Sequence, residues 1–248
     1  MRASALEFRL RYVVHLLIYV LGFTAPWNYL LHLDAGSSAG KALWLPAALE
    51  IERAGVLSLT GASNLLLALG IAFALAAASL RTWGAAYLGS AVVKDAGMHG
   101  AAVVADGPYR HLRNPLHLGT FLHTFALALL MPVSGAAFAI VAIGIVQLRL
   151  IGGEEAFLTA KLGQPYLAYK AKVPSVWPSL RARVPASGGH AAWGMAVVGE
   201  IYMWGVAVAF ASVGTRYNAL LVTQGVLIAL GVSLVARAFV PKAAEAIA

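Results

Sequence analysis

The chain has 248 residues, of which 60% are hydrophobic and 11% are charged, and its mean hydropathy is +0.79. A soluble domain carries about 25% charged residues, so the composition indicates an integral membrane protein and excludes an ordinary soluble enzyme. The chain has no cysteine, which excludes disulfides, thiolate nucleophiles and Cys-ligated metals, and we attribute the net charge of +8 to contact with anionic lipid rather than nucleic acid.

The apolar segments are long, rich in Ala and Leu, and do not alternate, which favours transmembrane helices over a β-barrel. We predict an all-α integral membrane protein with about six transmembrane helices, both termini cytoplasmic, and a non-Rossmann cofactor pocket at the cytosolic face. The basic N-terminus and long first apolar run predict a retained span, with Pro26 and Trp27 near its outer end. The expected spans are residues 12–31, 55–80, 115–131, 136–151, 191–213 and 217–240.

The basic residues divide unequally between the two sides of this arrangement. Lys41, Arg53 and Arg216 fall on one side. The other side holds the remaining fifteen of the eighteen: Arg2, Arg9, Arg11, Arg81, Lys94, Arg110, Arg113, Arg149, Lys161, Lys170, Lys172, Arg181, Arg183, Arg237 and Lys242. Since cytoplasmic loops carry the excess of Lys and Arg, we expect a bacterial inner-membrane protein whose active site faces the cytoplasm. We treat residues 1–248 as one polytopic membrane domain, with 190–240 an additional helical hairpin.

Two polar segments flank the third and fourth expected spans. The link "PVSG" between these spans is so short that they must form an antiparallel hairpin. The first segment carries Tyr109, Arg110, His111, Arg113, Asn114 and His117. The second carries Glu154, Glu155, Lys161, Gln164, Tyr166, Tyr169 and Lys170. The hairpin brings the segments together at its open end, where we expect a pocket for a charged cytosolic molecule.

Purely structural explanations exist for part of the first segment. The run 106–108, "DGP", predicts a turn, and Pro115 suits the first turn of a helix. Asn114 would then cap that helix, and the arginines would extend to lipid headgroups.

The tandem acidic residues also have two explanations. Glu154 and Glu155 follow a Gly pair and are expected to open a helical stretch, where carboxylates complement the helix dipole. Alternatively, they bind a cationic group such as an ammonium.

Other polar residues fall inside or beside the apolar runs. His111, His117 and His123 recur every six residues, a spacing that places them on different helix faces and disfavours a metal site. We expect His15 and His123 to hydrogen-bond to neighbouring helices. Glu200 lies within the fifth span, where it serves either a function or a bond between helices.

The patterns "GPYRHLRNPLHLG" and "EEAFLTAKLGQPYLAYKAKVPSVWP", separated by the hairpin, resemble the isoprenylcysteine carboxyl methyltransferase family, which belongs with the membrane phospholipid methyltransferases. That family's signature is G-P-Y…R-H-P-x-Y-x-G, followed by E-E-x-x-L, G-x-x-Y-x-x-Y and V-P. The resemblance covers about residues 80–180, the core motifs. Asn114 stands where the family usually has His, and His117 where it usually has Tyr.

The resemblance implies methyl transfer from S-adenosylmethionine in a helical membrane fold. Carried over by motif, the cofactor-binding residues are Tyr109, Arg113, Asn114, Pro115, His117, Glu154, Glu155, Tyr166 and Tyr169. The catalytic candidates are Arg113, His117 and Glu155. The expected partners are a lipidic or amphipathic acceptor and membrane lipids, without nucleic acid; the sequence leaves the oligomeric state open.

The chemistry of the cofactor suits these residue types. Glu154 or Glu155 can pair with its ammonium, and Arg113 can grip its carboxylate through two parallel hydrogen bonds. A carboxylate acceptor would need no base, whereas an amine would have to lose a proton to a Glu or to His117.

Two other functions remain as alternatives. A membrane reductase of the sterol type would use NADPH, but the tandem Glu disfavours a cofactor with several phosphates. A non-catalytic transporter would use Glu200 in its pathway.

Overall fold

The computed structural model describes residues 2–24, 42–89, 92–93, 98, 102–236 and 238. Of these described residues 76% are helical and none lies in a strand, so the predicted all-α class is confirmed. The α-helices are α1 (Ala5–Arg9), α2 (Arg11–Thr24), α4 (Trp44–Arg53), α5 (Leu59–Leu88), α7 (Pro115–Ala128), α8 (Val133–Leu162), α9 (Gln164–Lys172), α10 (Trp193–Gly199), α11 (Ile201–Val213) and α12 (Ala219–Ala236). Two short 3-10 helices are η1 (Gly107–Arg110) and η2 (Gly214–Arg216).

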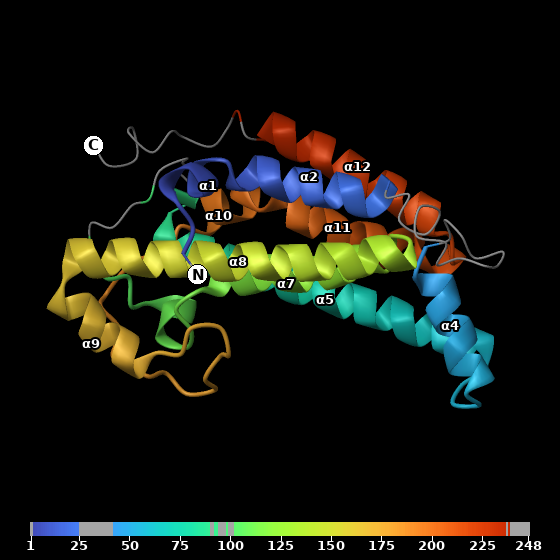
Figure 1. The fold of residues 1–248 in the computed structure, drawn as a ribbon, viewed down its shortest axis with the longest axis horizontal. Coiled ribbons are helices and arrows are strands. Elements are labelled where there is room, and N and C mark those ends of the chain that lie inside the picture. The colour runs from blue at the N-terminus through green and yellow to red at the C-terminus, as the bar shows by residue number, and fades with distance from the viewer. Residues whose placement is uncertain are drawn as a thin grey trace.

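The long helices lie side by side (Figure 1). Helix α8 packs between α2 and α7, α7 packs on α5, and α5 packs on α11, which in turn packs on α12. At one end of this body, α9, η1 and the segment after α9 form a lobe, which we call the polar lobe (residues 102–113 and 164–192). Helix α4 lies at the opposite end, in a region where we did not expect a helix.

The apolar helices indicate an integral membrane protein, but six spans are not confirmed. Among the described residues, helices α5, α8 and α12 are long and apolar enough to cross a membrane. If the bent pair α10–α11 counts as one span, the number of candidate spans rises to four. Helices α2 and α7 have 14 residues each, about 21 Å at 1.5 Å per residue, against a hydrocarbon core of about 30 Å. Residues 25–31, with Pro26 and Trp27, lie outside the described residues. The side of the membrane that each end faces stays a prediction.

Two helices continue past their expected ends. Helix α5 does not end at residue 80 but runs to Leu88, because Arg81 is paired inside the body rather than exposed at an interface. Helix α8 does not end at residue 151 but runs to Leu162. The Gly pair does not break it: Gly153 packs against Ala3, where a Cβ would come within 3.0 Å of the Ala3 carbonyl oxygen.

The fifth expected span is not one straight helix. It breaks at Glu200, where α10 and α11 meet at 66°. The Glu200 backbone leaves the helical conformation there (φ −107°, ψ 18°). Helix α12 provides the described part of the sixth span, and residues 237 and 239–248 lie outside the described residues, Arg237 and Lys242 among them.

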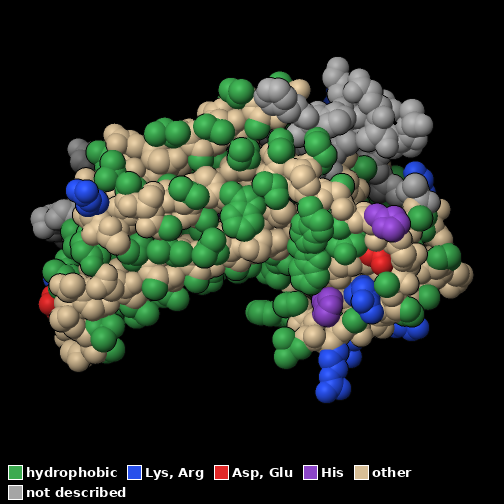
Figure 2. All heavy atoms as spheres, turned by 180° about the vertical axis from the view of Figure 1, so that it is seen from behind, with side chains coloured by type: hydrophobic (Ala, Val, Ile, Leu, Met, Phe, Trp, Pro, Cys, Tyr) green, Lys and Arg blue, Asp and Glu red, His purple; other side chains and the backbone are tan. Residues whose placement is uncertain are grey.

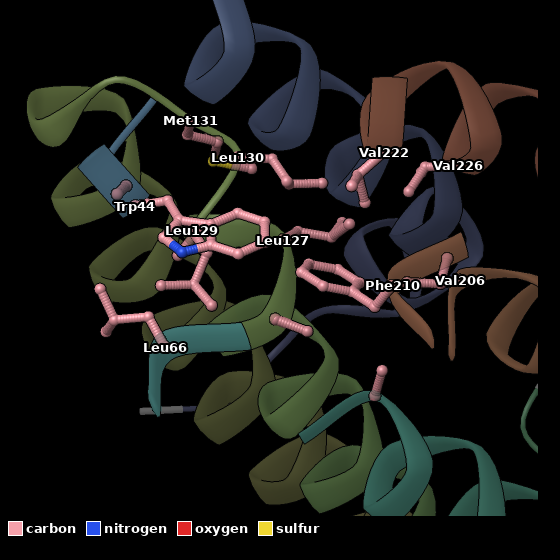
Figure 3. Packing of buried hydrophobic residues seen from close by; sticks show 14 of the residues in the cluster. Trp44, Leu66, Leu127, Leu129, Leu130, Met131, Val206, Phe210, Val222 and Val226 are labelled. Carbon is pink, nitrogen blue, oxygen red and sulfur yellow. The ribbon is translucent and has the colours of Figure 1, made fainter. Parts of the chain in front are cut away.

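The largest apolar cluster lies toward the α4 end of the body (Figure 3). Phe210 of α11 is fully buried there and stacks on Trp44 at 6.4 Å between ring centroids. Leu129 and Met131, at the turn between α7 and α8, and Val222 of α12 belong to the same cluster. This packing fixes the hairpin at its closed end and leaves its open end to the polar lobe.

We expect Phe210→Ala to destabilise the fold by about 3 kcal/mol, because a large buried ring leaves a cavity that the helices fill only partly. Thermal unfolding of the purified protein in one detergent measures the effect. Val208→Ala, on the same helix but 61% exposed, is the matched control and should be nearly neutral. Equal losses in both variants would contradict this account of the core.

Candidate functional site

The first part of the polar lobe contains the turn predicted from "DGP". Gly107 has φ +53°, and a Cβ there would lie 2.3 Å from the Tyr87 ring, so the turn requires glycine. Asp106, before it, is buried and accepts hydrogen bonds from the Ser187 hydroxyl and from the backbone N–H groups of Ser187 and Gly189. The Asp106 carboxylate thus fastens the end of the polar lobe to the start of η1.

The same hydrogen bonds affect the acidity of Asp106. The Ser187 hydroxyl, followed by the backbone N–H groups of residues 187–189, holds the pKa of the Asp106 carboxyl below its usual range. The side chain therefore accepts these bonds as a carboxylate throughout the neutral range.

The two sequence motifs on either side of the hairpin meet at Arg113 and Glu155. Arg113 Nε and Nη2 donate to Glu155 Oε1 at 3.0 and 2.9 Å. Arg113 Nη1 donates to the carbonyl oxygens of Lys170 and Val173 at 2.8 and 2.5 Å. Lys170 Nζ lies 2.8 Å from Glu155 Oε2. Arg113 and Lys170 therefore occupy both oxygens of Glu155, and this carboxylate joins α8 to α9 and to the segment that precedes α7.

Asn114 precedes α7 but does not cap it with its side chain. Its Nδ2 instead donates to the Ser175 carbonyl and hydroxyl oxygens, both at 3.1 Å, and to Glu155 at 3.3 Å. The capping explanation is wrong because the amide group turns toward the Glu155 cluster. Pro115 occupies the first helical position, as expected.

Glu154 and Glu155 do not open a helix. They lie deep within α8, which begins at Val133, so the helix-dipole explanation is wrong. Glu154 faces α7, where its Oε2 lies 3.1 Å from His117 Nε2. Its side chain is 29% exposed, against 11% for Glu155. Of the two carboxylates, Glu154 is the one a ligand can reach.

Three tyrosines line the inner side of the polar lobe. Helix α8 ends at Leu162, Gly163 follows with φ +61°, and α9 folds back so that Tyr166 and Tyr169 are buried. The Tyr169 hydroxyl donates to the Tyr109 carbonyl oxygen at 2.8 Å. Burial raises the pKa of Tyr166 to about 12 and that of Tyr109 further. The Tyr109 hydroxyl is buried without a hydrogen-bond partner among the described residues, an arrangement that favours a ligand contact.

A second buried ion pair lies beside the site. Arg81 Nε and Nη2 donate to the two carboxylate oxygens of Glu200 at 2.7 and 2.9 Å, and both side chains are buried. Arg81 Nη1 also donates to Thr120 at 2.8 Å and to the Leu116 carbonyl oxygen at 3.1 Å. Glu200 therefore joins the bend of the α10–α11 pair to α5 and, through Arg81, to α7. This answers the question left open for Glu200 in favour of a bond between helices.

The histidines bond to neighbouring groups and do not gather at one point. His123 Nε2 lies 3.3 Å from the Tyr202 hydroxyl, and His15 contacts Gln147, so both bond to neighbouring helices as expected. His111 Nδ1 lies 2.8 Å from the Ser179 carbonyl oxygen. Within the described ranges, no three His, Asp or Glu side chains gather as metal ligands would.

Sequence reasoning overlooked three residues of this region. Arg81 appeared only as a loop charge, and Gln147 and Ser175 were not considered. Gln147 is buried in α8 and contacts both His15 and His117. Gln147 could have been found from the sequence as the one amide in its apolar run, because a polar side chain in such a helix needs a hydrogen-bond partner.

An apolar groove runs along α5 near the site. Its volume is about 640 Å³, and it is lined by α5, α7 and the α10–α11 pair, with Trp83, Trp193 and Trp204 among its walls. On the face shown in Figure 2, hydrophobic side chains cover the long helices, whereas Lys, Arg and His gather mainly at the polar-lobe end. An amphipathic molecule would match both surfaces.

Removing one partner of the Arg81–Glu200 pair should strongly destabilise the folded protein. Either Arg81→Met or Glu200→Gln should destabilise the protein by about 3–5 kcal/mol, since the other group is left buried and unpaired. Thermal unfolding in detergent measures this. The exposed pair Arg53–Glu50 supplies the control, and Arg53→Met should cost less than about 1 kcal/mol. Equal effects at the two pairs would refute the burial argument.

Asp106→Asn should loosen the end of the polar lobe. A hydrogen bond to a charged acceptor contributes about 1.5–3 kcal/mol, so amide exchange at Ser187 and Gly189 should quicken about tenfold or more. Because the folded-state pKa of Asp106 is lowered, the protection should be present above the ordinary carboxyl pKa and vanish as the pH falls through the lowered one. Hydrogen exchange followed by mass spectrometry tests this, with Arg183→Ala in the same segment as control. Unchanged exchange in Asp106→Asn at neutral pH would contradict it.

A comparison with known families completes this description. The model of the phospholipid methyltransferase family matches residues 61–164, which span most of α5, η1, α7 and α8. The match includes both acidic residues of α8 but ends before the two tyrosines of α9. No curated protein and no solved structure matches the chain. Residues 61–164 thus carry the pattern of the phospholipid methyltransferases, the family that includes the isoprenylcysteine-type membrane methyltransferases, and the resemblance inferred from the motifs is confirmed.

Proposed function

We propose that the protein is an integral membrane methyltransferase that uses S-adenosylmethionine and acts on a lipidic or amphipathic acceptor. The observation that carries this proposal is the meeting of the α7 and α8 motifs, within the family match, around an accessible carboxylate at Glu154. Bound there, S-adenosylmethionine would supply a methyl group already activated by the sulfonium.

The residues of the site fit this donor. Its sulfonium and ammonium are cations, and Glu154 offers a partly exposed carboxylate. The buried hydroxyl of Tyr109 offers a hydrogen bond that no described residue takes up. A phosphate-rich cofactor such as NADPH would instead meet this carboxylate and be repelled, which disfavours the reductase alternative.

The site residues divide into two groups by their contacts. Glu155 already accepts from Arg113, Asn114, Ser175 and Lys170. We therefore assign Arg113, Asn114 and Glu155 to positioning the polar lobe on α7 and α8. Glu154 and Tyr109 are the groups that we assign to the donor, with His117 beside them; Pro115 holds the start of α7, and the α9 tyrosines close the pocket wall.

The surroundings support an amphipathic acceptor. The tryptophan-lined groove would accommodate an apolar chain, and the exposed Lys172, Arg181 and Arg183 of the polar lobe would attract an anionic headgroup. The reacting group would be a carboxylate, as in the isoprenylcysteine-type enzymes, or an amine. An amine would lose a proton before methylation, and the His117–Glu154 pair is the base in reach of the site.

Glu154→Gln should weaken binding of the stable product S-adenosylhomocysteine about tenfold to a hundredfold, because a charge-assisted bond to the ammonium contributes about 1.5–3 kcal/mol. Isothermal titration of the detergent-purified protein measures the dissociation constant. Glu50→Gln, at the opposite end of the molecule, is the control and should bind like the wild type. Wild-type affinity in Glu154→Gln would remove Glu154 from the donor site.

Purified protein supplied with S-adenosylmethionine labelled in the methyl group should transfer the label into a component of a total lipid extract. Treatment of the labelled product with mild base distinguishes the two acceptor types. A methyl ester hydrolyses and releases the label, whereas an N-methyl group keeps it. NADPH added in excess should not inhibit. Donor binding without label in any lipid or small-molecule fraction would refute the proposed activity.

A further inference from the structure

A chain of polar side chains crosses the helices from α2 to the site. His15 Nδ1 contacts the Arg11 carbonyl oxygen, and His15 Nε2 lies 2.6 Å from Gln147 Nε2. Gln147 Oε1 lies 2.5 Å from His117 Nδ1. His117 Nε2 then lies 3.1 Å from Glu154 Oε2. The chain thus ends on the carboxylate that we assign to the methyl donor.

The Arg11 carbonyl oxygen, at the α2 end of the chain of side chains, determines which group donates in each hydrogen bond. A carbonyl oxygen only accepts, so His15 Nδ1 must donate to Arg11. A neutral imidazole has one N–H, and His15 Nε2 therefore accepts from the Gln147 amide. The Gln147 oxygen then faces His117 Nδ1, which must donate.

The opposite orientation of the Gln147 amide is unfavourable. His15 would then have to donate from both nitrogens and carry a positive charge. The charged groups that act on His15 are His117, Arg81 and Arg11, all of them cations or potential cations. A buried cation among cations has no compensation, so the neutral form of His15, and with it the first orientation, is favoured.

This arrangement leaves one exchangeable proton between His117 and Glu154. His117 Nδ1 keeps its hydrogen because Gln147 needs a donor there. The Glu154 carboxylate only accepts, so Nε2 carries a second hydrogen and His117 is an imidazolium paired with Glu154. The other charged and titratable groups that act on this pair are Arg81 from α5 and His15 from α2, with Tyr109 of η1 and Tyr166 of α9 acting on Glu154.

We propose that His15 and Gln147 are positioning residues that hold His117 in this form, and that a cationic methyl donor binding at Glu154 displaces the proton from His117 Nε2. The inference rests on the proposed function because it takes Glu154 to be the carboxylate that binds the methyl donor. If the proton stayed, the His117 imidazolium and the cationic donor would share the Glu154 carboxylate in a poorly solvated site, where their repulsion is strong. The proton is released to solvent, and donor binding exchanges one positive charge for another.

The exchange prepares the site for the second substrate. Once the proton has left, Gln147 still holds the hydrogen on Nδ1, so the free lone pair of His117 is on Nε2, the nitrogen that faces Glu154 and the site. An amine acceptor could give its N–H proton to this atom. The base is therefore generated only when the donor is bound.

The first experiment uses no donor and so does not depend on the proposed function. The protein with ¹⁵N-labelled histidine is placed in lipid nanodiscs, and the ring nitrogen shifts are read at neutral pH. His15 should be neutral with hydrogen on Nδ1, and His117 should carry hydrogen on both nitrogens. Gln147→Leu should leave His15 with hydrogen on Nδ1, because the Arg11 carbonyl oxygen still accepts it, and should remove hydrogen from His117 Nδ1 in part of the molecules, because that atom has lost its acceptor. A His117 ring with bare Nδ1 in the wild-type protein would overturn the inference.

The second experiment counts protons. S-adenosylhomocysteine, which keeps the ammonium, is titrated into the protein by calorimetry in buffers of different ionisation enthalpy at neutral pH. The wild type should release about one proton per ligand bound. Gln147→Leu and His117→Gln should each release less than half as much, whereas His190→Gln, an exposed histidine of the polar lobe, should behave like the wild type.

The outcomes separate the two proposals. Ligand binding without proton release would overturn the exchange and leave the methyltransferase proposal intact. Failure to bind either S-adenosylhomocysteine or S-adenosylmethionine would overturn the methyltransferase proposal and, with it, the exchange, even if the ring shifts show the expected tautomers. Full proton release in Gln147→Leu would remove Gln147 from its positioning role.

Discussion

A charge buried between apolar helices needs a partner, because neither lipid nor packed side chains replace the water it has lost. Two pairs meet this need and organise the molecule. Arg81 with Glu200 joins α5 to the bend of the α10–α11 pair, and Arg113 with Glu155 joins the polar lobe to the α7–α8 hairpin. Each pair closes a contact between segments far apart in the sequence. Both pairs hold α7, which carries His117, so the geometry of the site depends on both.

These pairs also explain why only one of the two adjacent carboxylates is available for a ligand. Both oxygens of Glu155 accept bonds from the groups that hold the polar lobe. Glu154 is one residue away on another face of α8, and the bond described for it is to the ring of His117. Neighbouring positions on a helix point about 100° apart, so adjacent residues serve different surfaces. The pairing of Glu154 with His117, and of His117 with Gln147, then connects the donor carboxylate to the interior of the helical body.

Much of the candidate site followed from local sequence. The short "PVSG" link forces an antiparallel hairpin, and the motifs before and after it must then lie at the same end, as Arg113 and Glu155 do. The family resemblance followed from the same residues. Their individual roles did not follow, because they depend on which side chain reaches which partner. Asn114 was expected to cap α7 and instead contacts Ser175, sixty-one positions along the chain.

The sequence by itself determined the helical membrane class, the hairpin and the convergence of its two polar flanks, since apolar run length, composition and a short turn act locally. Only the tertiary structure decided where helices end and which charges are neutralised. Arg81 reads as an interfacial charge that ends a span, yet α5 runs through it because Glu200 arrives from 119 positions away. A charge's effect on a helix depends on its partner, and the partner is fixed by packing between distant segments.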